Sequence, residues 1–338
     1  MADLQAFREE TKSWLAENCP KGARGPGEVH TGSTKVTVSA DTQAWMEMMA
    51  EKGWTVPMWE KEYGGAGLSI AQTQVLFEEM SAIDARPPLV NMGTRMLGPT
   101  LLEFGTEDQK KRHLNLIARG GAAWCQGYSE PGAGSDLAGL NTRAVASGDE
   151  FIINGQKIWT SGAQNADWMF CLVRTDPDVP KHQGISYFLI DMRQPGVEVR
   201  PLKQMNGHAS FNEVFMTDAI VPAEDLVGGE GNGWAVATTT LSYERRGAAP
   251  TLSGASTSEN PQEGLVYDEY REELKIANEP YTWYPQRQGR VDLVMSRAKE
   301  TGAISDPVIR QEMAKLFCMS KGAVLASQAA EAKRKSGS

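Results

Sequence analysis

The sequence lacks both a dense block of lysine and arginine and a long apolar run. Its formal net charge is -9 at pH 7, whereas nucleic-acid binding needs a concentrated basic face, so nucleic acid is not expected as the main ligand. No stretch approaches the apolar length of a membrane span. Residues 1–20 show neither a signal-peptide core nor an arginine-rich transit character, so we expect a cytoplasmic protein.

Paired cysteines and clustered histidines are lacking as well. The four cysteines form no C-x-x-C pair and the four histidines show no ligand spacing, so neither a zinc site nor a disulfide framework is predicted. What the 338 residues do contain is 41% hydrophobic and 23% charged residues, which is enough for two or three packed domains. The composition is that of an ordinary globular protein.

Apolar residues recur at three- and four-residue intervals through the first third of the chain. This period predicts helices over residues 4–15, 41–52 and 69–80 and two short helices within 98–120. Ser39 or Asp41 is a candidate N-cap of the second helix, and Thr106 of the last. We expect an N-terminal helical domain over residues 1–120.

The pattern changes to short apolar runs separated by Gly, Pro or Asp between about residues 122 and 226. These runs predict an antiparallel β unit, which we place at residues 121–230. Asn154-Gly155 lies between two such runs and predicts a tight hairpin turn.

Helical periodicity returns from Gly233, and Asp306 with Pro307 begins a strong final helix. We therefore predict an α+β protein whose third domain, residues 231–338, is helical and carries a polar, proline-interrupted insert at about 251–290. The final helix has no later partner, so we expect an incomplete C-terminal helical bundle.

Residues 127–136, GYSEPGAGSD, combine three glycines with hydroxyls and carboxylates but no lysine. A phosphate cradle of the NTPase type needs Gly-Lys-Ser or Gly-Lys-Thr, whereas Gly134 is followed by Ser135 and Asp136. The dinucleotide fingerprint also has a different spacing. The residues alone leave open a surface turn or a ligand-binding turn.

The sequence resembles the acyl-CoA dehydrogenase family in four motifs in the family's order. They are EYGGAGLS at 62–69, YSEPGAGSD at 128–136, INGQKIWTSGAQNADW at 153–168 and GGEGNGWAVATTTLSYER at 228–245. The resemblance covers most of the chain up to about residue 250. It implies a helical domain, a β domain and a helical bundle, with FAD between the last two and against a neighbouring subunit.

The resemblance implies roles for six residues around FAD. Tyr128 and Ser129 would contact the isoalloxazine, Gly134 and Ser135 the pyrophosphate, Trp159 would cover one flavin face, and Ser161 would lie beside N5. Ser135 would also contact substrate. Glycine suits a turn that a ligand approaches closely, and an indole stacks well on a flat ring. Without the family, Trp159 reads as a cross-strand packing residue.

Glu244 matches one of the two positions at which the family carries its catalytic base. The base removes the α proton of an acyl-CoA thioester while hydride leaves the β carbon, and burial against apolar substrate suits a carboxylate to this task. Arg245 matches an arginine near the family's active site, where it would orient substrate. The alternative for Glu244 is an ion pair with Arg245 or Arg246. The second base position, near the chain end of other members, has no counterpart.

The sequence departs from the family after residue 250, where the Arg-x-x-Phe-Gly segment that reaches the partner's FAD is missing. Two functions follow from the resemblance. One is a flavoenzyme that makes a 2-enoyl-CoA and forms a homodimer or homotetramer. It would pass electrons to an electron-transferring flavoprotein or, as an oxidase, to oxygen. The other is a non-catalytic or flavin-poor subunit of a heteromeric assembly. The acyl group is left open, and the insert is a channel wall, a subunit contact or a loop.

Overall fold

The computed structural model describes residues 2–25, 35–205, 209–247 and 291–336. The chain divides into two compact units, Met1–Leu274 and Lys275–Ser338. The predicted insert at about 251–290 lies outside the described residues.

The first unit begins with five α-helices that confirm the helical periodicity of the sequence. Side-chain caps fix where several of these helices start. At the second helix, the side chain of Ser39, and not that of Asp41, accepts a hydrogen bond from the backbone N–H of Thr42. Ser69 and Thr106 each form a capping box, which satisfies two backbone donors at once. The helices are α1 (Ala2–Asn18), α2 (Ala40–Glu51), α3 (Ile70–Ala82), α4 (Gly98–Phe104) and α5 (Glu107–Ala118), with a π-helical turn at Gly93–Leu97 before α4.

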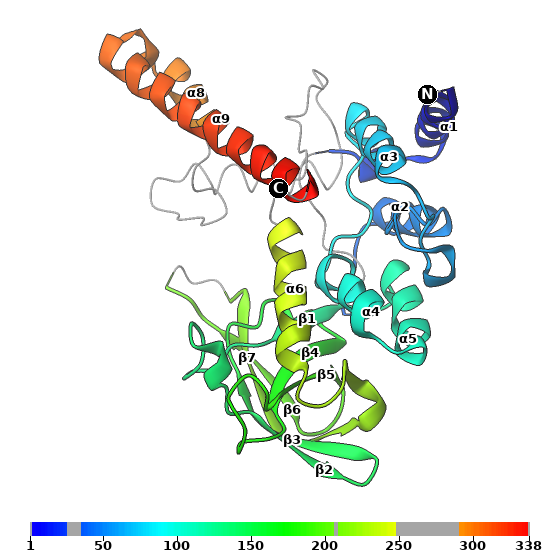
Figure 1. Cartoon of the computed structure of the whole chain (residues 1–338). Helices are drawn as coiled ribbons and strands as arrows, with labels where there is room; N and C mark the ends of the chain where they lie inside the picture. The colour runs from blue at the N-terminus through cyan, green and yellow to red at the C-terminus, as the bar shows by residue number, and fades with distance from the viewer. Residues whose placement is uncertain (1, 26–34, 206–208, 248–290, 337–338) are drawn as a thin grey trace. The chain divides into compact units, whose positions relative to one another are not determined.

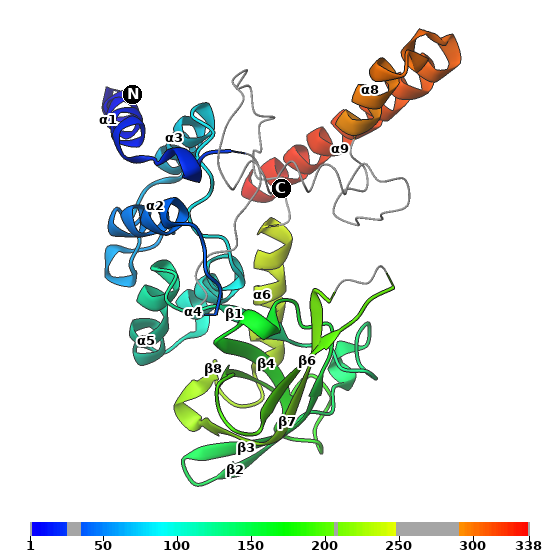
Figure 2. The same ribbon diagram turned by 180° about the vertical axis from the view of Figure 1, so that it is seen from behind.

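One sheet follows the helices in the chain. Its strand order is β6-β7-β3-β2-β4-β5-β8, and β1 pairs with β4 off this path. Figure 2 shows β6, β7 and β3 side by side. The strands are β1 (Trp124–Gly127), β2 (Arg143–Ser147), β3 (Glu150–Lys157), β4 (Trp168–Arg174), β5 (Ile185–Asp191), β6 (Val197–Leu202), β7 (Phe211–Pro222) and β8 (Leu226–Val227).

The β domain is mainly antiparallel, as predicted, but β1 runs parallel to β4. A parallel neighbour requires a long crossover rather than a hairpin, and here residues 128–167 supply it. The pattern of short apolar runs cannot distinguish the two directions. The glycine-rich stretch is the first part of this crossover.

The predicted hairpin at Asn154-Gly155 is wrong. Strand β3 continues through both residues, and its register against β7 shifts between Ile153 and Gly155, which is a β-bulge. Gly155 has φ +156°, and a Cβ there would lie 2.5 Å from the Thr142 hydroxyl oxygen. The glycine therefore permits a bulge and a close approach rather than a turn. The hairpin turn lies earlier, between Ser147 and Glu150, where Gly148 has φ +63°.

Helix α6 (Gly233–Gly247) follows the sheet and lies between α4 and β5 (Figure 1). Val236, Ala237 and Thr240 are buried and recur at helical spacing, so one face of α6 packs inward. Val236 and Ala237 belong to a core that also includes Leu101 of α4 and Tyr187 of β5. This core fixes α6 against the sheet that precedes it.

The second unit contains α8 (Val291–Glu300) and α9 (Pro307–Ser336). The two helices are in contact, and Ala298 and Met313 are buried among the side chains that the structure describes. The predicted cap is confirmed, because the Asp306 carboxylate accepts the backbone N–H of Val308 at 2.7 Å.

No helix within the described residues is both long enough and apolar enough to span a membrane. Nor do those residues contain a group of three or more His, Cys, Asp or Glu arranged to hold a metal ion. Cys19, Cys125 and Cys171 are buried free thiols, and burial raises the pKa of each, which leaves them as unreactive packing residues.

Candidate functional site at the glycine-rich turn

The glycine-rich stretch leaves the end of β1 and closes into a short turn. Glu130 and Ala133 exchange backbone hydrogen bonds of 2.9 and 3.0 Å across Pro131-Gly132. Tyr128 is buried before the turn, whereas Gly134 and Ser135 are exposed after it. The turn is thus buried where it begins, at Tyr128, and exposed to solvent where it ends, at Gly134 and Ser135.

The glycines of this stretch differ in what the fold requires of them. A Cβ at Gly127 would lie 2.4 Å from the Met169 sulfur, so packing demands glycine there. A Cβ at Gly132 or Gly134 would meet nothing within 4 Å, and neither residue has a positive φ. The chain's own packing does not explain these two glycines, but close approach of a ligand to the backbone would.

The second motif of the resemblance lies directly beside this turn. The backbone N–H of Ile158, just after β3, donates to the carbonyl oxygen of Ser129 at 2.9 Å. On the other side, Thr160 and Asn212 exchange backbone hydrogen bonds of 3.0 and 3.1 Å. Residues 158–161 are therefore held between the glycine-rich turn and the start of β7. The hydrogen bond thus joins Ser129 to Ile158, the residue before Trp159.

A buried ion pair ties the same two segments together. The Lys157 ammonium, which is fully buried, donates to the Glu130 carboxylate at 2.8 Å and to the Tyr128 carbonyl oxygen at 3.2 Å. The same carboxylate accepts the backbone N–H groups of Asn141 and Thr142 at 2.6 and 2.9 Å. Glu130 is thus satisfied by three donors from two sides of the turn.

The electrostatics of Glu130 follow from these contacts. Burial alone would raise its pKa, but the charge and hydrogen bond of Lys157, together with the hydrogen bonds of Thr142 and Asn141, outweigh burial and lower it. Glu130 is therefore ionised at neutral pH and acts as the acceptor that organises the turn. Sequence analysis did not identify either partner of this pair as a site residue.

Trp159 has an unusual backbone. Its φ is +60°, a left-handed conformation that is rare for a large side chain, and its side chain is 54% exposed. The indole contacts the Phe211 ring edge-on, with ring centroids 5.8 Å apart. A strained residue that exposes an aromatic ring is typical of a ligand-binding position. The alternative of a cross-strand packing residue fits this exposure poorly.

Because of the strain at Trp159, we expect a glycine variant at this position to be more stable than an alanine variant, which is the reverse of the usual order. We expect the Trp159→Gly protein to be more stable than Trp159→Ala by about 1 kcal/mol, because alanine retains the left-handed penalty and glycine does not. The free energy of unfolding in urea, measured without flavin, would give the difference. Ile158, whose φ is not positive, is the control position. There we expect the Ile158→Ala protein to be more stable than Ile158→Gly. Equal or reversed stabilities at position 159 would contradict the strain.

Glu244 lies near the end of α6 and is exposed, as is Arg245. It follows Thr240 by four residues and so continues the helix face that packs inward. No ion pair joins Glu244 to Arg245 in the described part of the chain, while the side chain of Arg246 lies outside it. Its neighbour Tyr243 donates a hydrogen bond to Glu103 of α4, which fixes the last turn of the helix.

A network of buried hydroxyl groups lies between α6 and the glycine-rich turn. The Thr240 hydroxyl is 3.0 Å from that of Thr100 and 3.4 Å from that of Tyr187. The ring of Tyr128 packs edge-on against Tyr187 and Phe170. Burial raises the pKa of Tyr128, and the Glu244 carboxylate adds to the rise.

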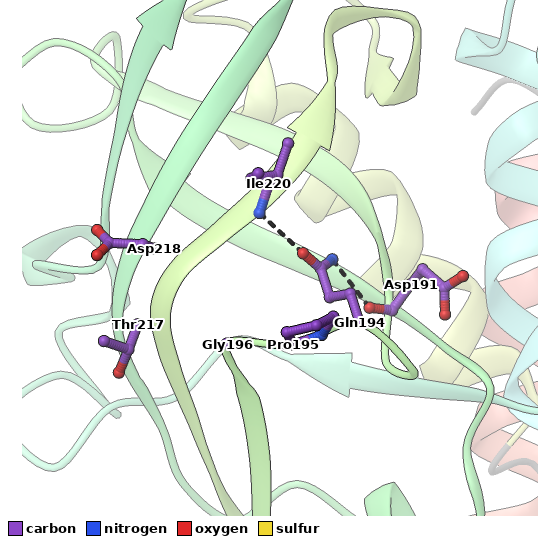
Figure 3. A pocket seen from close by; sticks show the side chains of 7 residues that line it. All are labelled: Asp191, Gln194, Pro195, Gly196, Thr217, Asp218 and Ile220. Atoms are coloured by element: carbon purple, nitrogen blue, oxygen red, sulfur yellow. Dashed lines mark hydrogen bonds between the residues drawn. The ribbon is translucent and has the colours of Figure 1, made fainter.

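Two surface cavities lie elsewhere. One, of about 420 Å³, is formed at the β5–β6 turn, where Gln194 bridges the Asp191 carbonyl oxygen and the Ile220 N–H (Figure 3). The other, of about 320 Å³, includes Arg112 and Arg193, both already paired with carboxylates. None of the predicted site residues lines either cavity.

Known protein families match most of the chain before α6. The family model "Acyl-CoA dehydrogenase, N-terminal domain" matches residues 1–121, and "Acyl-CoA dehydrogenase, middle domain" matches residues 125–219. The chain is 38% identical to the acyl-CoA dehydrogenase IpdE1 of Mycolicibacterium smegmatis over 93% of its own length and 74% of that protein. The chain belongs to the acyl-CoA dehydrogenase family. The resemblance noted in the sequence is confirmed, and so is the predicted fold class.

Other relatives agree with this assignment. The acyl-CoA dehydrogenase IpdE1 of Mycobacterium tuberculosis is 44% identical over 72% of this chain and 64% of its own length. Among solved structures, the Tcur3481-Tcur3483 steroid ACAD G363A variant is 29% identical with a TM-score of 0.67, over 100% of this chain and 78% of that one. This chain therefore spans about two thirds to three quarters of the length of these relatives.

The acyl-CoA dehydrogenases are FAD-dependent oxidoreductases, and the residues of this chain fit such a cofactor. The exposed indole at a strained backbone, the two glycines that packing does not require, and the half-buried Ser129 and Ser161 lie on two adjacent segments. Tyr128 differs from the other predicted contacts, because its ring is buried among aromatic side chains. The individual roles of all eight site residues stay predictions.

Proposed function

We propose that this chain binds FAD and dehydrogenates an acyl-CoA thioester between its α and β carbons, giving the 2-enoyl-CoA. The observation that supports this most is the hydrogen bond between Ile158 and Ser129, since it joins the glycine-rich turn to the segment of the exposed Trp159. A flat ring would find one face against the indole and hydroxyl groups at its edge.

The chain's residues would hold the cofactor and substrate in the following way. The Trp159 indole covers one face of the flavin, with the Ser129 and Ser161 hydroxyls at its edge, and Tyr128 contributes to the ring's surroundings. The open backbone at Gly134 and Ser135 admits the pyrophosphate, and Ser135 also contacts the substrate. When bound, FAD supplies the acceptor for the hydride that leaves the β carbon.

Glu244 would act as the base. Its carboxylate takes the α proton, the electron pair of that C–H bond forms the new double bond, and the hydride leaves from the β carbon. Glu244 suits this role because it extends the inward face of α6 and has no ion pair with Arg245 in the described residues. Arg245, also exposed, would orient the substrate.

The visible spectrum tests the proposed function. We expect purified protein, or protein reconstituted with FAD, to be yellow and to lose its absorbance anaerobically on addition of a suitable acyl-CoA. The panel of thioesters should vary in length and branching and include a steroid-derived acyl group, because one similar structure is a steroid ACAD. Bleached protein that reoxidises with an electron-transferring flavoprotein, and only slowly with oxygen, would be a dehydrogenase rather than an oxidase. Colourless protein that FAD cannot restore would contradict an independent flavoenzyme.

A heteromeric assembly is the second candidate. It is favoured by the Tcur3481-Tcur3483 steroid ACAD, a similar structure whose name joins two proteins. In that case the chain would be a non-catalytic or flavin-poor subunit, and flavin would be retained only when a second acyl-CoA dehydrogenase chain is co-expressed with it. Light scattering of the purified chain separates this from a homodimer or homotetramer.

A further inference from the structure

Asn212, a fully buried residue at the start of β7, directs its side-chain amide at the segment that carries Trp159. Its Nδ2 donates to the carbonyl oxygen of Thr160 at 3.0 Å and to the side-chain oxygen of Gln164 at 2.5 Å. A carbonyl oxygen only accepts, so the group that faces Thr160 must be the NH₂ group. A carboxylate has no donor and a hydroxyl has one, so this pair of hydrogen bonds requires an amide.

Asn212 also holds Thr160 through the backbone. The Asn212 N–H donates to the Thr160 carbonyl oxygen at 3.1 Å, and the Thr160 N–H donates to the Asn212 carbonyl oxygen at 3.0 Å. The Thr160 carbonyl therefore accepts two hydrogen bonds from one residue. Thr160 is buried and directly follows Trp159, so these bonds fix the peptide groups beside the left-handed residue.

This arrangement leaves buried polar atoms without partners. Within the described residues, neither Asn212 Oδ1 nor Thr160 Oγ1 has a hydrogen-bond partner. Each such atom costs free energy, and the left-handed backbone of Trp159 adds strain. Costs of this kind gather where a fold holds a functional side chain in place.

We propose that Asn212 is a positioning residue, whose side-chain amide holds residues 159–164 in the conformation that presents the Trp159 indole to a flat ligand. The neighbouring Phe211 ring contacts the indole edge-on, so the start of β7 supports both the backbone and the ring of this segment. That the ligand is FAD rests on the proposed function. The role of Asn212 in fixing the backbone does not.

Coupled stability measurements on the flavin-free chain test this role. In the wild-type background, Trp159→Gly should exceed Trp159→Ala about fivefold in the ratio of folded to unfolded protein, because glycine avoids the left-handed penalty. In the Asn212→Ala background this advantage should fall below about twofold, because the backbone is no longer held by the amide. Urea unfolding of the four proteins gives both ratios.

Gln156→Ala provides the matched control background. The Gln156 side chain also joins β3 to β7, but its partner is Glu213, at 2.8 Å, rather than a residue of the Trp159 segment. In this background the advantage of glycine at position 159 should persist. An advantage that persists in Asn212→Ala, or that falls equally in both backgrounds, would overturn the proposal.

A second variant covers the case in which Asn212→Ala does not fold. Asn212→Thr suits a strand, and its hydroxyl cannot supply two donors, so the same comparison applies to it. In protein labelled with 5-fluorotryptophan, the ¹⁹F resonance that is missing from Trp159→Phe reports the Trp159 indole. It should move in Asn212→Thr and stay fixed in Gln156→Ala. An unmoved resonance in Asn212→Thr would equally overturn the proposal.

Titration of the flavin-free proteins with FAD tests the link to the cofactor. We expect Asn212→Ala to raise the FAD dissociation constant about tenfold, as the loss of one or two hydrogen bonds from a binding segment would, and Gln156→Ala to raise it less than about twofold. An unchanged constant in Asn212→Ala would mean that Asn212 does not position the segment for FAD. If the wild type binds no FAD yet the stabilities are coupled, the proposed function fails and Asn212 remains the residue that positions Trp159.

Discussion

Glu244→Gln is expected to slow anaerobic bleaching of the flavin by an acyl-CoA about 10²- to 10⁴-fold. Glutamine has the same shape as glutamate but cannot take the α proton at neutral pH. Because the residue lies at the exposed end of α6 and outside the packed core, the substitution should leave the fold and flavin content unchanged. Stopped-flow absorbance after mixing with the best thioester of the panel gives the rate.

Glu103 provides the matched control for this substitution. It is a carboxylate on the adjacent α4, and it accepts a hydrogen bond from Tyr243, the residue before Glu244. Glu103→Gln should change the bleaching rate by less than a factor of a few, since it removes a charge nearby but not the base. Full-speed bleaching in Glu244→Gln would remove Glu244 from the base role. A comparable loss in both variants would indicate disturbance of the last turn of α6 rather than loss of a base.

Local signals in the sequence predicted the helices well, because the caps that start them depend only on neighbouring residues. Thr106 and Gln109 satisfy each other's backbone N–H groups in the first turn of α5, and no distant contact is needed. The same holds for Asp306 at the start of α9. Such residues specify their conformation within one helical turn, so the pattern and the structure agree.

Signals that depend on tertiary contacts were misread or missed. Asn154-Gly155 is a strong local signal for a hairpin, yet pairing with β7 carries β3 through it, and Thr142 occupies the space that a side chain at position 155 would need. The parallel pairing of β1 with β4 likewise depends on where the crossover returns. Neither outcome is encoded in the few residues that form it.

At the candidate site, too, the sequence predicted which residues are present but not the features that depend on tertiary contacts. The family motifs gave Ser129, Trp159 and Glu244, but not the left-handed backbone of Trp159, which is maintained by contacts to Ser129 and the start of β7. Lys157 was missed because a lysine at the end of a strand normally points to solvent. Its partner is a buried carboxylate 27 residues earlier in the sequence, which no local pattern reveals.

Removal of the buried ammonium is expected to have the largest effect on stability. Lys157→Met should reduce the free energy of unfolding by about 3–5 kcal/mol, because it leaves the Glu130 carboxylate buried without its counter-charge. Glu130→Gln should be similarly destabilising, since it leaves the ammonium unpaired. Urea unfolding followed by tryptophan fluorescence measures both. The glycine-rich turn and the Trp159 segment are joined by this pair, so flavin affinity should fall with stability.

The double variant Glu130→Gln/Lys157→Met should recover much of the lost stability, because it buries no unpaired charge. The difference in the free energy of unfolding between the wild type and the double variant should also depend on pH. The pKa of Glu130 is lowered in the folded state, so its contribution is fully present above the unfolded value of about 4.3 and is lost as the pH falls through the folded one. Wild type should therefore lose stability relative to the double variant below about pH 4.3. A pH-independent difference, or a double variant as unstable as either single one, would mean that packing rather than charge pairing joins the two segments.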